Sequence, residues 1–106
     1  HYAPKAQVTI LKGDFEKYKA YLQEHAAPGV FAMCFTGEGK ELPVPAIEYG
    51  INGDGASQAH HLFTALRECD KEGAQVVYAR CPLSDGVSMA VYNRLLRAAA
   101  FRVEEL

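Results

Sequence analysis

Residues 62–99 read LFTALRECDKEGAQVVYARCPLSDGVSMAVYNRLLRAA, and this stretch decides the fold. Apolar residues recur at spacings of three and four, which predicts a helix with one buried face formed by Ala59, Leu62, Phe63 and Leu66. Gly73 ends that helix. The run VVYA at 76–79 is apolar without alternation, which is typical of a strand buried on both faces. A turn and a second helix follow. A strand flanked by two helices predicts an α/β layered domain.

The rest of the chain continues this alternation of strands and helices. We expect strands at 7–11, 30–35, 46–49, 76–79 and 101–104, and helices at 14–26, 54–73 and 87–99. Asp14 and Asp54 are the expected N-caps of the first two helices. Helical crossovers imply a mostly parallel sheet of about five strands with helices on both faces. We expect the strand order 3-2-1-4-5 and, at the carboxyl ends of the strands, a ligand-binding position formed by loops 12–14 and 80–86.

The composition is that of one globular domain. The chain has 106 residues, of which 49% are hydrophobic and 23% charged. A net charge of −2 gives no electrostatic basis for binding nucleic acid or an anionic membrane. No apolar run approaches the roughly 18 residues that cross a bilayer. The three cysteines lack CxxC spacing, which favours reduced thiols in a cytoplasmic protein over a disulfide framework or a zinc site.

The amino-terminal residues read HYAPKA and have the character of a linker. No apolar segment of a signal peptide follows His1. A chain that begins with His is either processed or a fragment, and we favour a fragment of a longer protein. We therefore assign residues 1–6 to the end of a linker and residues 7–106 to the domain.

The turn at 80–88 is one candidate binding site. The candidate turn is Gly86, Val87 and Ser88. The backbone N–H groups at a helix N-terminus can hold an anion, Gly86 would let the backbone approach it, and Ser88 could add a hydroxyl. The alternative is a plain strand–turn–helix connection capped by Asp85 or Ser84, and a capping aspartate would repel a phosphate. The absence of GxGxxG and GxxxxGK[ST] disfavours a dinucleotide site or a P-loop.

The arginines of the helices are a second candidate. On the last helix Arg94 and Arg97 point away from the predicted sheet. They form either a solvated face or a pair of guanidinium forks for a partner carboxylate or phosphate. Arg67 lies at the flank of its own helix, where it could pair with Glu68 or Glu72.

Catalytic and metal-binding motifs are missing from the sequence. His60 and His61 are adjacent on a helix and point about 100° apart, so they cannot chelate one metal as an i, i+4 pair could. No GxSxG surrounds a serine. We expect no catalytic residue and no metal ligand in this chain.

Three segments together resemble one family. They are HYAPKA at 1–6, LFTALRECDKEGAQVVYA at 62–79 and GVSMAVYNRLLRAA at 86–99. They are similar to the small Rossmann-like C-terminal domain of two-domain threonylcarbamoyl-AMP synthases, which act in the t6A modification of tRNA. The family's GLG turn reads Gly86-Val87-Ser88 here, so a serine stands where the family has its second glycine.

The resemblance implies a function for the parent protein. An N-terminal YrdC-like catalytic domain, which is not part of this chain, would act as a nucleotidyltransferase. It would bind ATP and Mg²⁺ and convert L-threonine, bicarbonate and ATP into threonylcarbamoyl-adenylate. No catalytic residue or cofactor is implied for this domain. The resemblance implies that it positions a linker over the catalytic domain, through contacts made by His1, Tyr2, Arg67, Asn93, Arg94 and Arg97.

Two other functions stay open at this stage. The first is a nucleotide- or small-anion-binding Rossmann-like module that uses the turn at Gly86, Val87 and Ser88. The second is contact with tRNA, which the acidic composition does not support.

Overall fold

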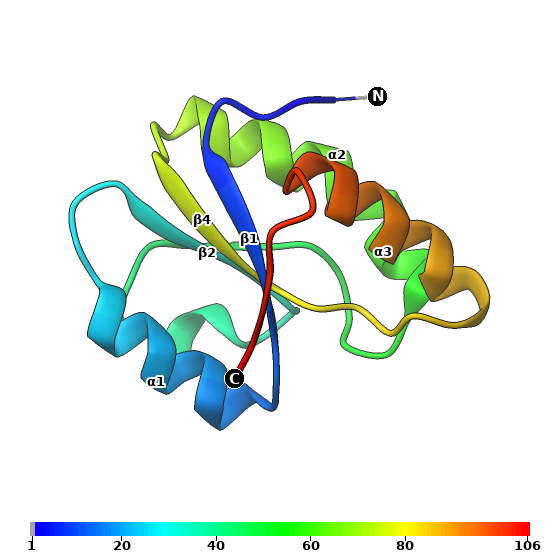
Figure 1. Ribbon diagram of the computed structural model, residues 1–106, viewed down its shortest axis with the longest axis horizontal. Helices are drawn as coiled ribbons and strands as arrows, with labels where there is room; N and C mark the ends of the chain where they lie inside the picture. The colour runs from blue at the N-terminus through cyan, green and yellow to red at the C-terminus, as the bar shows by residue number, and fades with distance from the viewer. Residues whose placement is uncertain (1) are drawn as a thin grey trace.

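The computed structural model describes residues 2–106, which form one five-stranded sheet with all neighbouring strands parallel (Figure 1). The strands are β1 (Gln7–Lys12), β2 (Val30–Cys34), β3 (Ala46–Glu48), β4 (Val76–Arg80) and β5 (Val103–Glu105). The helices are α1 (Phe15–His25), α2 (Gly55–Lys71) and α3 (Gly86–Ala98), with a short 3₁₀ turn at Gly39–Glu41. The elements predicted from the sequence are therefore present, with small differences at their ends.

The strand order is β3-β2-β4-β1-β5, so the predicted order 3-2-1-4-5 is wrong. Strand β4 lies between β2 and β1, and Val77 pairs with Val8 on one side and with Phe31 on the other. The predicted order places both β1 and β4 inside the sheet, as the structure does. The apolar runs of these strands do not indicate which of the two lies beside β2, because burial on both faces gives each strand the same pattern.

The last strand begins later than predicted. Ala100 and Phe101 have positive φ angles of 49° and 64°, so they form a left-handed turn after α3 instead of the start of a strand. The N–H of Phe101 bonds the carbonyl of Leu96 across this turn. Extended structure begins only at Val103.

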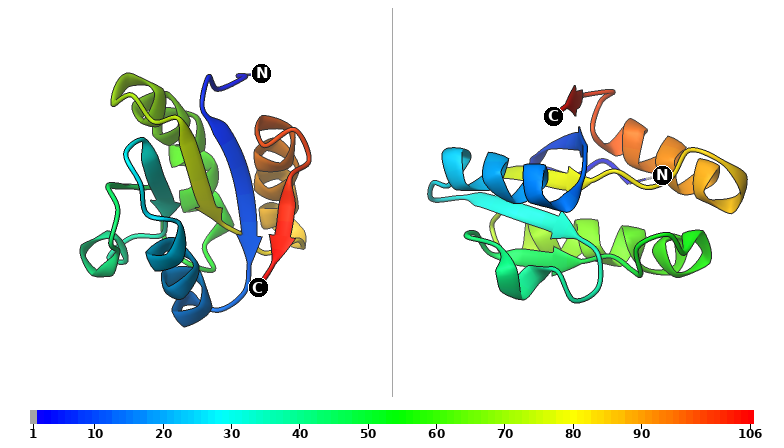
Figure 2. Two further views of the ribbon diagram at one scale, coloured as in Figure 1. Left: turned by 60° about the vertical axis from the view of Figure 1, so that its left-hand side comes forward. Right: turned by 90° about the horizontal axis from the view of Figure 1, so that it is seen from below.

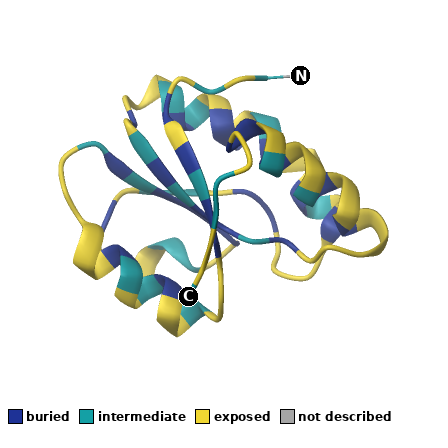
Figure 3. Ribbon diagram, in the orientation of Figure 1, coloured by how far each residue is buried: buried dark blue, intermediate teal, exposed yellow. Residues whose placement is uncertain are grey.

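Helices cover both faces of the sheet, which confirms the predicted three-layer, Rossmann-like α/β fold (Figure 2). On one face Val8, Ile10, Val77 and Ala79 pack in a cluster with apolar residues of α2 and α3. On the other face Leu11 packs in a second cluster with Tyr18 and Leu22 of α1. The buried residues follow the central strands and the helix sides that face them (Figure 3). Helices α2 and α3 therefore lie side by side on one face.

Local helix signals give the expected caps at two helices. Asp14 accepts a hydrogen bond from the N–H of Lys17 at 2.8 Å, and Asp54 accepts one from the N–H of Ser57 at 3.1 Å. Among residues 2–106, no helix is both long enough and apolar enough to cross a membrane.

Candidate functional site

The chain that leads into β1 is bound to the carboxyl-terminal end of α2. The carboxylate of Asp70 accepts a hydrogen bond from the Tyr2 hydroxyl at 2.5 Å. It also accepts bonds from the backbone N–H of Lys5, at 3.0 Å for the shorter contact, and from that of Ala6 at 3.1 Å. We call this arrangement of Asp70 with Tyr2, Lys5 and Ala6 the Asp70 anchor. It fixes residues 2–6 against α2.

The electrostatics of the Asp70 anchor match its geometry. Burial raises the pKa of Asp70, but the hydrogen bonds from Tyr2, Lys5 and Ala6 lower it by more, so the pKa lies below its usual value. The hydrogen bond to Asp70 raises the pKa of Tyr2, and burial adds to this effect. At neutral pH the carboxylate is therefore charged and the phenol keeps its proton, as a donor–acceptor pair requires.

Tyr2 also contacts α2 through its ring. The guanidinium carbon of Arg67 lies 6.0 Å from the centre of the ring, which is within the range of a cation–π interaction. Phe63, Arg67 and Asp70 are spaced four and three residues apart, so they project from one side of α2. The three side chains therefore form one continuous surface of α2, against which Tyr2 and the residues that follow it lie.

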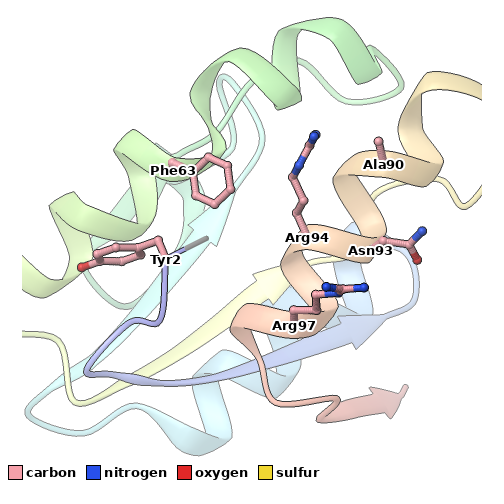
Figure 4. A pocket seen from close by; sticks show the side chains of 6 residues that line it. All are labelled: Tyr2, Phe63, Ala90, Asn93, Arg94 and Arg97. Carbon is pink, nitrogen blue, oxygen red and sulfur yellow. The ribbon is translucent and has the colours of Figure 1, made fainter.

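A groove of about 560 Å³ lies between this surface of α2 and α3 (Figure 4). We call it the α2–α3 groove, and its lining residues are Tyr2, Phe63, Ala90, Asn93, Arg94 and Arg97. Phe63 and Tyr2 form one side, and the Arg94 side chain extends from α3 into the space between the helices (Figure 4). A second hollow of about 500 Å³ shares Asn93 and Arg97 and continues to Leu96 and Phe101.

The α2–α3 groove has positive charge beside an aromatic wall. Within residues 2–106 the only ion pair joins Arg80 and Glu38, so Arg94 and Arg97 have no carboxylate partner in the described part of the chain. Guanidinium forks bind carboxylates and phosphates, and Phe63 offers apolar surface beside them. Among residues 2–106, those that line the groove include no Ser, Cys, His, Asp or Glu. The guanidinium groups and the aromatic wall are suited to binding an acidic partner.

Most of the residues predicted to make linker or interdomain contacts meet at this place. Tyr2, Asn93, Arg94 and Arg97 line the groove, and Arg67 lies over Tyr2. His1 lies outside the described residues. That these side chains dock a linker or another domain stays a prediction.

Asp70 and Phe63 were not among the predicted contact residues. A carboxylate in the last turn of a helix opposes the helix dipole, but Glu68 and Glu72 share this feature, so it does not single out Asp70.

The structure describes the turn at 80–88, but anion binding by Gly86, Val87 and Ser88 stays a prediction. Ser88 is buried against α2, where a Cβ on Gly55 would lie 2.6 Å from the Ser88 Oγ. Gly86 has a φ of 55°, and Val87 is 65% exposed. Asp85 occupies the N-cap position, but its side chain makes no capping hydrogen bond. The hydroxyl of Ser88 therefore packs at the contact between α2 and α3.

At the carboxyl ends of the strands, where a ligand position is predicted, Arg80 bonds two other parts of the chain. The Arg80 guanidinium donates to the carbonyl of Gly13 at 3.1 Å and to both carboxylate oxygens of Glu38 at 3.1 Å. The rings of Phe15, Tyr18 and Phe35 lie 5.2–5.6 Å from the guanidinium carbon. Loops 12–14 and 80–86 are therefore held together by Arg80.

The described residues, 2–106, contain no group of three His, Cys, Asp or Glu side chains arranged to hold a metal ion. The rings of His60 and His61 lie 4.9 Å apart in an edge-on arrangement.

Comparison with known proteins identifies the family. The sequence profile of the threonylcarbamoyl-AMP synthase C-terminal domain matches residues 1–100. The chain is 34% identical to the threonylcarbamoyl-AMP synthase of Pyrococcus abyssi (strain GE5 / Orsay) and 32% identical to that of Bacillus subtilis (strain 168). Each alignment covers 97% of this chain and 31% of the relative. The chain thus spans about a third of the length of these curated relatives.

Solved structures agree with the sequence matches. The fold superposes on P. abyssi Sua5, crystallised with L-threonine, with a TM-score of 0.76 and 25% identity over 100% of this chain and 32% of that one. It superposes on the C-terminal Sua5 domain from Pyrococcus horikoshii with a TM-score of 0.65 and 27% identity, over 98% of this chain and 100% of that one. The chain belongs to the Sua5_C family, the C-terminal domain of threonylcarbamoyl-AMP synthases.

Proposed function

We propose that this chain is the C-terminal accessory domain of a threonylcarbamoyl-AMP synthase and that it positions the preceding linker over the catalytic domain. Residues 1–6 are the end of that linker in this proposal, and residues 7–106 are the domain. The observation that carries the proposal is that Tyr2 takes part in both features of the site: it is bound to Asp70, and it lines the α2–α3 groove.

The parent enzyme would form threonylcarbamoyl-adenylate from L-threonine, bicarbonate and ATP and release pyrophosphate. The ATP and Mg²⁺ belong to the catalytic domain in this proposal, and this domain needs no cofactor. We place the enzyme in the cytoplasm, which is supported by the three free thiols of Cys34, Cys69 and Cys81.

The groove supports docking because of its chemistry and its place. Arg94 is exposed and lacks a carboxylate partner among residues 2–106, so it can pair with an acidic group from the linker or the catalytic domain. The aromatic wall adds apolar area beside that pair, and interfaces are enriched in such arginine and aromatic residues. The linker enters directly at this groove through Tyr2.

Replacing Arg94 in the full-length enzyme tests the proposal. We expect Arg94→Ala to reduce threonylcarbamoyl-AMP formation, while the urea midpoint of the domain changes little, because truncation of an exposed side chain alters stability by about 0.5 kcal/mol or less. Lys17→Ala is the matched control, since it removes an exposed cation from α1 on the opposite face. Turnover of Arg94→Ala equal to that of the wild type would overturn the proposal.

A small-anion-binding module is the second candidate, and it is favoured by the arginines of the groove, which have no carboxylate partner among residues 2–106. The domain is suited to a direct test, because its relative from P. horikoshii was crystallised as a separate domain. Calorimetric titration of the isolated domain with ATP, AMP and GTP would show heat at millimolar ligand if this candidate were right. Heat that disappears in Arg94→Ala would place the anion in the groove, and no heat would remove the candidate.

A further inference from the structure

Asp70 lies where a carboxylate does not stabilise its own helix. It is in the last turn of α2, near the negative end of the helix dipole. Glu68 and Glu72 flank it, but neither side chain bonds residues 2–6, whereas Asp70 bonds three groups of that segment. The position of Asp70 is therefore explained by the chain that it holds.

The Asp70 anchor holds the linker at two levels. Nearer to the sheet, one carboxylate oxygen accepts from the N–H groups of both Lys5 and Ala6, immediately before β1 begins at Gln7. Further out, the other oxygen accepts from Lys5 and from the Tyr2 hydroxyl. The inner contacts fix where the chain enters the sheet. The outer contact fixes where the Tyr2 ring lies.

The outer contact shapes the α2–α3 groove. With its hydroxyl held by Asp70 and its ring beside Arg67, Tyr2 stands next to Phe63 and faces α3 across the groove (Figure 4). Without the bond to Asp70, no other hydrogen bond among the described residues would hold the Tyr2 side chain in this place. The wall of the groove therefore depends on a residue that does not line it.

We propose that Asp70 is a positioning residue for the synthase: it binds residues 2–6 to α2 and holds Tyr2 as a wall of the α2–α3 groove, which Arg94 lines from α3. This inference rests on the proposed function and adds the residue that sets the path of the linker. Asp70 acts through Tyr2 and the backbone, not by contact with a substrate.

The first test follows the anchor itself, in the isolated domain. Amide hydrogen exchange at Lys5 and Ala6 is measured by NMR in the wild type, Asp70→Asn, Tyr2→Phe and the control Glu72→Gln. We expect exchange at both amides to be about tenfold faster in Asp70→Asn, because their acceptor is weakened. Glu72→Gln removes the same charge from the same helix end and should leave both amides protected. Tyr2→Phe should loosen only the outer contact. Unchanged exchange in Asp70→Asn, or an equal effect of Glu72→Gln, would overturn the anchor.

The second test asks whether the anchor and the groove act together in the full-length synthase. We expect Asp70→Asn to reduce threonylcarbamoyl-AMP formation and the double variant Asp70→Asn/Arg94→Ala to lose little more than the worse single variant, since both changes disable one arrangement. Losses that multiply fully in the double variant would overturn the positioning role. Faster amide exchange with unchanged synthesis in all variants would instead overturn the proposed function and leave the anchor in place.

Discussion

Arg80 is the only charged side chain buried among residues 2–106. Its guanidinium joins the ends of β1 and β4 and pairs with Glu38 inside a group of aromatic rings. Such a pair need not stabilise the fold relative to apolar residues, but each partner makes burial of the other tolerable. Arg80 therefore links the end of β4 to Gly13 and Glu38, at the end of the sheet where α/β folds commonly bind ligands.

Replacing Arg80 alone should be costly. We expect Arg80→Met to lower the free energy of unfolding by about 3–5 kcal/mol, because Glu38 is left largely buried without its partner. The double variant Arg80→Met/Glu38→Gln should recover much of this loss. Urea unfolding of both variants measures the difference. A single variant as stable as the double variant would contradict this interpretation.

The Asp70 anchor should make stability depend on pH in a defined direction. The folded-state pKa of Asp70 lies below its usual value, so the ionised carboxylate stabilises the folded state at and above neutral pH. This contribution is lost as the pH falls through the folded-state pKa, below about 4. We expect the wild type to exceed Asp70→Asn in urea midpoint at pH 7 and the gap to shrink in acid. If the difference between the two urea midpoints increased in acid, the ionised carboxylate of Asp70 would not be what stabilises the folded state.

Neither Asp70 nor Arg80 could be assigned its partners from the sequence. Glu38 lies 42 positions from Arg80, and Tyr2 lies 68 positions from Asp70. Sequence periodicity relates residues only within one helix or one strand, so it cannot pair residues that are this far apart in the chain. The resemblance to a family brought Tyr2, Asn93, Arg94 and Arg97 together as candidates, whereas the residue types alone left the arginines as an ordinary solvated face.

At the scale of elements, the main contact that the sequence hides is between the starts of α2 and α3. Gly55 begins α2 and lies against the backbone and hydroxyl of Ser88. Asp14 and Asp54 were predicted as caps because a cap acts on the next three residues. The burial of Ser88 against Gly55 is tertiary, so local sequence rules could not anticipate it.

Gly55 should be intolerant of a methyl group although Ala favours helices. A Cβ at this position would lie 2.8 Å from the Ser88 backbone nitrogen. We expect Gly55→Ala to destabilise the domain by about 1–3 kcal/mol through overpacking. The exposed neighbour gives the control, since Ala56→Gly should cost only about 0.5–1 kcal/mol. Thermal unfolding compares the two. A Gly55→Ala variant more stable than the wild type would mean that α2 and α3 move apart without loss of stability.

At the scale of the whole molecule, helices on both faces give the domain two buried layers. The sequence was sufficient for the α/β class, the number of strands and the sheet's parallel sense, because these follow from the alternation of apolar runs with amphipathic helices. It was not sufficient for the order of β1 and β4, which depends on which pairing packs the helices best. The groove between α2 and α3 follows from that arrangement, so it could not be predicted from the sequence either.

The cysteines should report on the integrity of both layers. Burial raises the pKa of Cys34 and of Cys69 to about 12, and the two thiols lie in the clusters on opposite faces of the sheet. We expect neither to be alkylated at pH 8 until the whole domain unfolds, whereas the half-buried Cys81 reacts earlier. Mass spectrometry after alkylation with and without denaturant measures this. Modification of Cys34 or Cys69 in the native state would indicate that one layer opens independently.

The entry of the chain into β1 has a mechanical consequence. The chain enters at the amino end of β1, and its last residues lie at the carboxyl end of the neighbouring parallel strand β5 (Figure 1). A pull between the two ends acts along these strands and loads the hydrogen bonds between them at the same time, in shear. Peeling, which breaks such bonds one after another, needs a pull across the strands. With the carboxyl end held, tension that reaches β1 from the linker therefore loads these hydrogen bonds together.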